Sequence, residues 1–136
     1  MDELFQLRII ATNKSFYEGK AKSLVIPTST GERGILAHHA GMMCAINMGE
    51  LRFQTDGGEW RSILVGAGSM SVNNNQVLVL VDTVETLEEI DIERAEQAIV
   101  RAQERMRQKQ SQRQYMMSQA AMARALSRLK YKDKNN

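Results

Sequence analysis

The N-terminal part of the chain consists of short apolar runs separated by clusters of polar turn formers. A partly alternating run at 4–10 precedes the cluster Thr12–Ser15, and a second run at 21–27 ends at Pro27, the only proline of the chain. Proline cannot donate to a strand ladder, and threonine, serine and asparagine favour turns. Both runs therefore predict β-strands that end in turns.

Two further pairs of apolar runs have the pattern of β-hairpins. The runs 51–54 and 60–65 flank Asp56-Gly57-Gly58, whose glycines can adopt the positive φ angles of a tight turn. The runs 69–72 and 77–81 flank three asparagines, which tolerate the left-handed conformation. Short strands at this spacing predict an all-β domain over residues 1–87, a flattened antiparallel β-sandwich or barrel.

From Asp91 onward the apolar positions follow a helical period. Steps of three and four residues place one set of side chains on a single helix face: Ile92, Ala95, Ile99, Ala102 and Met106. Asp91 is the expected N-cap, because its carboxylate can accept a hydrogen bond from a free amide of the first turn. Glu93 adds negative charge near the positive end of the helix dipole.

A second helix is expected after the polar segment Gln110–Gln114. Its apolar side is expected to be formed by Met116, Ala120 and Ala123, beside Tyr115, Met122, Leu126 and Leu129. The C-terminal domain is thus predicted to be an antiparallel helical hairpin over residues 88–136.

Alanine is frequent along the expected seam between the two helices. A buried methylene contributes about 0.8 kcal/mol of hydrophobic free energy, and an alanine seam buries few of them. Isolated helices of about 15 residues are also marginally stable in water. We therefore predict a bistable arm that opens and closes. The alternative is a hairpin that packs permanently against the β-domain.

The charges of the chain are distributed unevenly between its two parts. Residues 1–87 contain 7 Lys/Arg and 9 Asp/Glu, whereas residues 88–136 contain 11 and 7. The segment Arg105–Lys132 has eight Lys/Arg and no carboxylate. This arm should prefer an anionic partner.

The sequence contains no recognisable catalytic or metal-binding constellation. His38 and His39 are adjacent, which does not align two imidazoles on a helix, and a lone Cys44 is expected to be a small buried side chain. The segment Gly31–Gly34 lacks the lysine and the spacing of a phosphate-binding loop and is interpreted as a turn. We expect no membrane span and no targeting signal.

Four arginines of the helical part form a candidate anion site. Arg94 and Arg101 lie two turns apart, about 10 Å along one helix, and Arg124 and Arg128 lie one turn apart on the other. If the helices fold back, the guanidinium groups can converge on the triphosphate of a nucleotide, with Glu85 and Asp91 placed for ribose or base. A solvated basic face is the alternative.

Two motifs resemble the epsilon subunit of bacterial F-type ATP synthases. The segment 31–41, Gly-Glu-Arg-Gly-Ile-Leu-Ala-His-His-Ala-Gly, is similar to the family signature Gly-Glu-x-Gly-Ile-x-Pro-x-His-Ala-Pro, with Ala37 and Gly41 where prolines are usual. These departures are expected to loosen the loop. The segment 90–95 matches the pattern Ile/Leu-Asp-x-x-Arg-Ala, which accompanies ATP binding in members with a folded hairpin.

The resemblance implies a non-catalytic subunit of the central stalk, peripheral on the cytoplasmic face of the bacterial plasma membrane. Its partners would be the gamma subunit, the c subunits of the rotor ring and the alpha/beta catalytic head, which the hairpin inhibits when extended. Glu32 and His39 match positions that face the rotor ring. ATP as a regulatory ligand would be bound by Glu85, Ile90, Asp91, Arg94, Ala95, Arg101, Arg124 and Arg128, without a metal.

Two other classes of function compete with this interpretation. A nucleic-acid-binding module would use the basic segment 105–132, but its aromatic residues are limited to Tyr115 and Tyr131, too few for a stacking platform. Salt-dependent binding to DNA or RNA would support that class. A small-molecule enzyme would need a nucleophile paired with a base, and the sequence shows no such pair.

Overall fold

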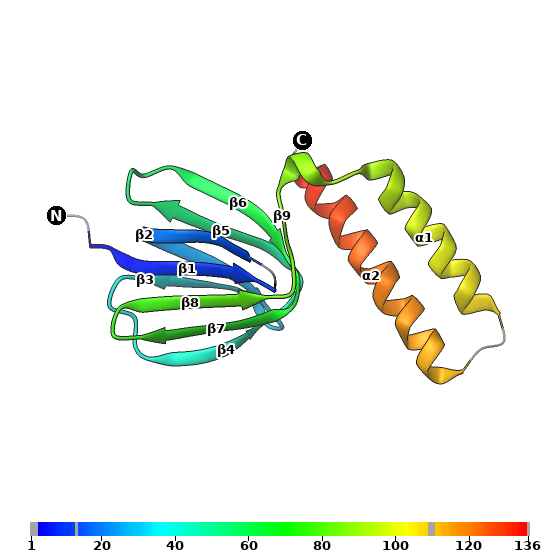
Figure 1. Ribbon diagram of the computed structural model, residues 1–136, viewed down its shortest axis with the longest axis horizontal. Coiled ribbons are helices and arrows are strands. Elements are labelled where there is room, and N and C mark those ends of the chain that lie inside the picture. Colours follow the sequence, from blue (N-terminus) through cyan, green and yellow to red (C-terminus); the bar gives the residue numbers. More distant parts are fainter. Residues whose placement is uncertain (1–2, 13, 109–110, 136) are drawn as a thin grey trace. The chain divides into compact units, whose positions relative to one another are not determined.

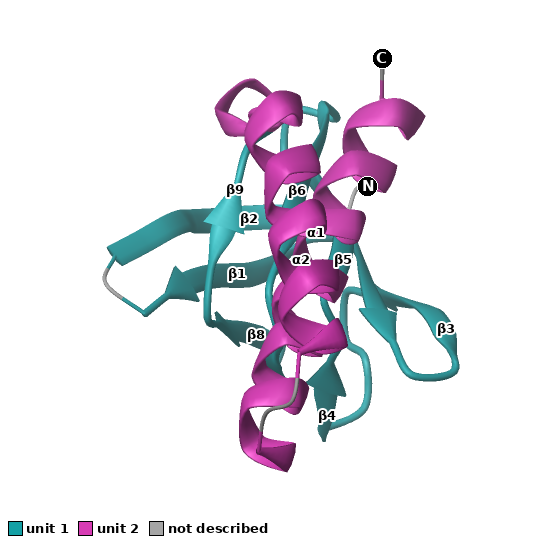
Figure 2. Ribbon diagram, turned by 90° about the vertical axis from the view of Figure 1, so that its right-hand side faces the viewer, with its two compact units in different colours: residues 1–86 teal, residues 87–136 magenta. Residues whose placement is uncertain are grey.

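The computed structural model describes residues 3–12, 14–108 and 111–135. The chain divides into two compact units, residues 1–86 and 87–136, which Figure 2 colours separately. The sequence places the boundary one residue later, and Leu87 instead opens a short 3-10 helix, η1 (Leu87–Glu89), of the second unit. Each unit is described by itself below.

The first unit is a single sheet of nine described strands (Figure 1). They are β1 (Phe5–Ala11), β2 (Lys14–Thr28), β3 (Gly31–Leu36), β4 (Met42–Ile46), β5 (Gly49–Thr55), β6 (Trp60–Val65), β7 (Gly68–Asn73), β8 (Gln76–Val81) and β9 (Val84–Glu85). The order is β4-β7-β8-β1-β2-β5-β6-β9, and β3 pairs with β2. The pairing of β1 with β8 is parallel, which departs from the antiparallel arrangement that the sequence predicts.

Alternating side chains of the strands form one apolar core. Phe5, Leu7 and Ile9 of β1 are buried, whereas the residues between them point outward. Strands far apart in the sheet order contribute to the same cluster, for example β5 through Phe53 and β8 through Val79. The sheet therefore folds over on itself, and the predicted β-sandwich is confirmed.

The two predicted hairpins are present, and their turns have the backbone conformation that their residues favour. Gly58 between β5 and β6 has φ 89°, and Asn74 and Asn75 between β7 and β8 have φ 51° and 61°. Glycine and asparagine reach this left-handed region at low cost, so the turn residues fix the register of both hairpins.

Two local predictions in this unit are wrong. The segment Gly31–Gly34 is not a turn but the start of β3, where Glu32 pairs with Pro27 of β2. In addition, β2 begins at Lys14, within the predicted turn cluster Thr12–Ser15, so the predicted strand at 21–27 is only its second half. The carbonyl of Pro27 near its end accepts a hydrogen bond from the amide of Asn47 at 3.0 Å. The partner strand supplies pairing that the local composition, rich in glycine and charge, does not suggest.

The second unit contains the predicted hairpin of α1 (Ile92–Arg107) and α2 (Gln112–Lys134), shown in Figure 1. Asp91 caps α1, since its Oδ1 accepts the amide of Arg94 at 3.1 Å. Ser111 and Gln114 form a capping box at the start of α2, so the helix begins within the expected polar segment. Gln110 lies outside the described residues.

The inward face of α1 is as predicted except at Ile92, which is 39% exposed, but that of α2 is not. Ala95 and Ala102 of α1 are buried, with Ile99 and Met106 half-buried. On α2 the buried residues are Ser118, Ala125 and Tyr131, whereas most of the predicted apolar side is exposed: Tyr115, Met116, Ala120, Ala123 and Leu126. Apolar residues occur all around α2, so its sequence period does not reveal which face packs. None of the described helices is long and apolar enough to cross a bilayer.

Candidate functional site

The two helices of the hairpin meet along small side chains. Ala95 and Ala102 of α1 and Ser118 and Ala125 of α2 are at most 6% exposed. Such residues allow the backbones to approach closely, but they remove little apolar area from water, at about 25 cal/mol per Å². The hairpin therefore gains only modest free energy from its seam.

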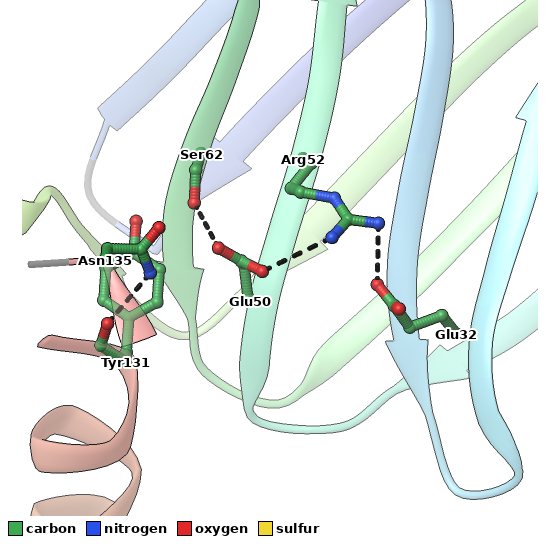
Figure 3. A network of polar contacts seen from close by, with 6 residues as sticks. All are labelled: Glu32, Glu50, Arg52, Ser62, Tyr131 and Asn135. Atoms are coloured by element: carbon green, nitrogen blue, oxygen red, sulfur yellow. Dashed lines mark hydrogen bonds and ion pairs between the residues drawn. The ribbon is translucent and has the colours of Figure 1, made fainter. Parts of the chain in front are cut away.

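Polar contacts fasten the base of the hairpin. The Nζ of Lys132 donates a hydrogen bond to the carbonyl of Leu87 at 2.8 Å, which ties the end of α2 to η1. In the last turn, the backbone and side-chain amides of Asn135 both donate to the carbonyl of Tyr131, the latter at 2.8 Å (Figure 3). These bonds hold the chain end in helical geometry.

One groove of the hairpin carries positive charge contributed by both helices. Arg105 of α1 and Arg124 of α2 line the same groove of about 460 Å³, with Gln108, Gln114, Met117, Ser118 and Ala121. On α1, Arg94 and Arg101 precede Arg105 by eleven and four residues, which places them on the same flank of the helix. On α2, Arg128 lies one turn after Arg124. The fold therefore places the four predicted arginines on one side of the hairpin.

Arg105 is a further member of this group, and it belongs to neither of the two arginine pairs predicted from the sequence. Its four-residue spacing from Arg101 is the signal that identifies it once the flank is known. The sequence alone gives no reason to prefer it over Arg107 or Arg113, because only the fold shows which flank faces the groove.

The groove on the other side of the hairpin has a different character. It measures about 500 Å³ and is lined by both charge signs and by apolar side chains: Ile92, Glu96, Leu126, Leu129, Lys130 and Asp133. Glu96 and Asp133 make this side unsuited to a polyanion. The two grooves therefore differ in the ligand that each can accept, and only the arginine side suits phosphate.

The remaining predicted nucleotide residues differ in how accessible they are. Ile90 and Ala95 are 6% and 5% exposed, so they can contribute packing and backbone shape only. Glu85 is half-buried on β9, opposite Leu64 of β6 in the first unit. Asp91 is exposed, and its Oδ1 is engaged in the helix cap.

Replacement of Asp91 by alanine is expected to lower hairpin stability by about 1 kcal/mol, because the amide of Arg94 loses its acceptor. Asp91→Ser keeps an acceptor and removes the charge. Thermal melting of helical circular dichroism should show a loss for alanine and little change for serine. If ATP affinity falls in both variants, the carboxylate itself contacts the ligand.

The predicted rotor-facing residue Glu32 belongs to a polar network on the outer face of the β unit (Figure 3). Its Oε2 lies 3.0 Å from a guanidinium nitrogen of Arg52, whose other terminal nitrogen lies 3.6 Å from Glu50. The hydroxyl of Ser62 donates to the other oxygen of Glu50 at 2.7 Å. An exposed ion pair of this kind contributes about 0–1 kcal/mol to stability, so the fold does not depend on it.

The second predicted rotor-facing residue, His39, lies beyond the other end of β3. The five residues from Glu32 to Leu36 span about 13 Å of extended strand. The backbone amide of His38 donates to Asn75 Oδ1 at 2.7 Å, and the amide of His39 donates to the carbonyl of Leu36. The structure does not bring Glu32 and His39 together, and it ties this loop to the β7–β8 turn.

The helical unit offers little for base stacking. Tyr131 is 4% exposed, so Tyr115, at 42%, is the accessible aromatic side chain of the described part of this unit. No group of three or more metal-binding side chains occurs among the described residues. In the described residues of this unit, the geometry favours phosphate recognition by guanidinium groups over base stacking or metal binding.

Comparison with known families covers almost the whole chain. The model of the ATP synthase delta/epsilon chain beta-sandwich domain matches residues 4–87, and that of the long alpha-helix domain matches residues 88–132. The chain belongs to the ATP synthase delta/epsilon family. The predicted resemblance is thereby confirmed, and as an epsilon-type member the chain is a non-catalytic subunit.

Relatives of this epsilon type occur in several bacteria. The ATP synthase epsilon chain of Caldanaerobacter subterraneus subsp. tengcongensis is 38% identical over 98% of this chain and 97% of its own length. The epsilon chain of Ruminiclostridium cellulolyticum is 40% identical over 92% of each. The match at full length includes the helices as well as the sandwich.

Solved structures share the fold at low sequence identity. A chain in the mitochondrial ATP synthase of Euglena gracilis, from an OSCP/F1/c-ring assembly, superposes with a TM-score of 0.79 and 21% identity over 93% of this chain and 79% of that one. A chain in the central stalk and c-ring structure of the Tetrahymena thermophila mitochondrial ATP synthase superposes with a TM-score of 0.64. Its sequence identity is 12%, and the match covers 93% of this chain and 95% of that one. The fold of sandwich and hairpin therefore occurs in these structures as well.

Proposed function

We propose that this epsilon-type chain is a regulatory subunit of the central stalk of a bacterial F-type ATP synthase. Its β unit links the gamma subunit to the c subunits of the rotor ring, through surfaces that include Glu32 and His39. Its hairpin extends toward the alpha/beta head to inhibit ATP hydrolysis and folds when it binds ATP. The chain acts on the cytoplasmic face of the plasma membrane, without crossing it.

The observation that carries the regulatory part is the one-sided arginine groove on a weakly sealed hairpin. Arg105 and Arg124 line it from different helices, so opening the hairpin separates them. A ligand that needs both sets of cations binds the closed form better than the open form. Such a difference in affinity is the requirement for a ligand to shift a conformational equilibrium.

ATP fits this requirement through its triphosphate. Arg94 and Arg101 approach from α1 and Arg124 and Arg128 from α2, and guanidinium groups form paired hydrogen bonds with phosphate oxygens. ATP at ten times its dissociation constant would stabilise the closed hairpin by about 1.4 kcal/mol. For a hairpin near balance, this changes the ratio of closed to open molecules about tenfold.

Replacement of Arg124 by alanine is expected to weaken ATP binding to the full chain at least about tenfold, since one charge-assisted contact to phosphate is lost. Calorimetric titration measures this directly. Lys130→Ala is the matched control, because Lys130 lies on the same helix but lines the opposite groove. Equal affinities of wild type and Arg124→Ala would contradict the site.

A second ATP titration tests whether ATP closes the hairpin, with energy transfer between labels on α1 and α2 as the readout. Assembly is tested separately by copurification of the chain with gamma and the rotor ring. A chain that binds ATP but not gamma would argue against the stalk position, and a chain that binds gamma without response to ATP would argue against the regulation.

A further inference from the structure

The polar network around Arg52 joins residues of three strands, β3, β5 and β6, on the outer face of the β unit. Arg52 lies on β5, opposite Ser62 of β6 on one side and Val25 of β2 on the other. Beyond β2 lies β3, which carries Glu32. The guanidinium of Arg52 therefore reaches across β2 to contact Glu32, as Figure 3 shows.

The network has a fixed end and an exposed end. The Glu50 side chain is 11% exposed, and Ser62 donates to its Oε2 while Arg52 approaches its Oε1. The Arg52 side chain is 36% exposed and that of Glu32 is 55% exposed. The nearly buried Glu50 carboxylate therefore restrains the guanidinium of Arg52, and the guanidinium in turn restrains the accessible carboxylate of Glu32.

We propose that Arg52 is a positioning residue for docking on the rotor ring, which holds the Glu32 carboxylate so that its Oε1 accepts a hydrogen bond from a cationic or amide donor of the partner. This inference rests on the proposed function. Arg52 contacts both Glu50 and Oε2 of Glu32, so the ion pair restrains the exposed Glu32 carboxylate and leaves its Oε1 as the acceptor for the partner.

The charge of the network indicates the chemistry of the partner. Two carboxylates and one guanidinium leave one net negative charge, which favours a positively charged or N–H-bearing loop and disfavours an acidic one. Holding the glutamate in place before docking reduces the side-chain entropy lost on binding, which is the general benefit of preorganisation.

The test is a double-mutant cycle on binding of the full chain, in complex with gamma, to the detergent-solubilised rotor ring. Arg52→Ala and Glu32→Gln are each expected to weaken binding about tenfold, as for loss of one charge-assisted hydrogen bond. The double variant is expected to bind as weakly as Glu32→Gln alone, because Arg52 acts through Glu32. Arg52→Lys should retain only part of the affinity. Lysine keeps the positive charge, but its single ammonium cannot contact both carboxylates as the guanidinium fork does.

Arg8→Ala is the matched control. Arg8 forms a cross-strand pair with Glu18 at 3.9 Å, similarly exposed but on β1 and β2. Its removal should leave ring binding unchanged. Additive losses in the cycle, or unchanged affinity in Arg52→Ala or in Glu32→Gln, overturn the positioning role. Failure of the wild-type complex to bind the ring overturns the proposed function itself, and the inference with it.

Discussion

Replacement of Phe53 by alanine is expected to lower the free energy of unfolding of the β unit by about 3–5 kcal/mol. Phe53 is fully buried in the centre of the core cluster. Its ring lies 4.7 Å from that of Tyr17, and the guanidinium carbon of Arg61 lies 5.4 Å above it. Truncation leaves a cavity and removes both ring contacts, so the loss exceeds the transfer free energy of the side chain.

Urea denaturation followed by the fluorescence of Trp60, the only tryptophan, measures this loss. Trp60 pairs with Gln54 next to Phe53, so its signal reports on this part of the sheet. Leu36→Ala serves as the control, because Leu36 is 64% exposed and its truncation should cost less than about 0.5 kcal/mol. A loss below about 1.5 kcal/mol for Phe53→Ala would show that the core closes around the cavity.

Tyr17, whose ring contacts that of Phe53, has a pKa above its ordinary value. Partial burial raises the pKa of Tyr17, the carboxylate of Asp56 raises it further, and Arg61 opposes both. The hydroxyl donates to the carbonyl of Lys20 at 2.9 Å, a bond that needs the protonated form. The raised pKa and this bond both favour neutral tyrosine at physiological pH.

Replacement of Ala125 by leucine is expected to destabilise the closed hairpin by about 1–3 kcal/mol and to weaken ATP binding correspondingly. Ala125 is fully buried in a seam whose other members include Ala95 and Ala102. Three added carbons do not fit between backbones held together by alanine. Because the seam contributes little burial, a cost of this size shifts the hairpin toward the open form.

Energy transfer between labels on α1 and α2, with and without ATP, measures the shift, and the hydrolysis rate of the assembled enzyme measures its effect. The proposed function predicts stronger inhibition by this variant. Ala123→Leu is the control, since Ala123 is exposed on the same helix. Identical behaviour of the two variants would place the weak point of the hairpin elsewhere.

The proposed regulation and the proposed docking use different parts of the chain, which makes them separable. Arg124 and Ala125 act on the hairpin, whereas Arg52 and Glu32 act on the outer face of the sandwich. Variants of one group should leave the readout of the other unchanged. Combined substitutions from the two groups are expected to be additive, because they share no partner.

Several features of the candidate sites depended on pairings that no local pattern contains. The segment 31–34 has the glycines and charges of a turn, yet it forms a strand because β2 offers an edge. No sequence pattern marks Arg52, since its partners Glu32 and Glu50 are 20 and 2 residues away and only strand pairing brings all three to one face. Arg105 of α1 likewise lines the arginine groove only because the packing of the two helices brings it beside Arg124 of α2.

The sequence by itself determined the two hairpins of β5–β6 and β7–β8, both helices, the turns at Gly58 and Asn74, the cap at Asp91 and the membership of the family, but not the strands β3, β4 and β9. These features rest on residue type and short-range period, which are properties of neighbouring positions. The tertiary structure alone decided the parallel pairing of β1 with β8, the buried face of α2 and the partners of Glu32. These depend on contacts between distant segments, where the free energy of packing outweighs local preference.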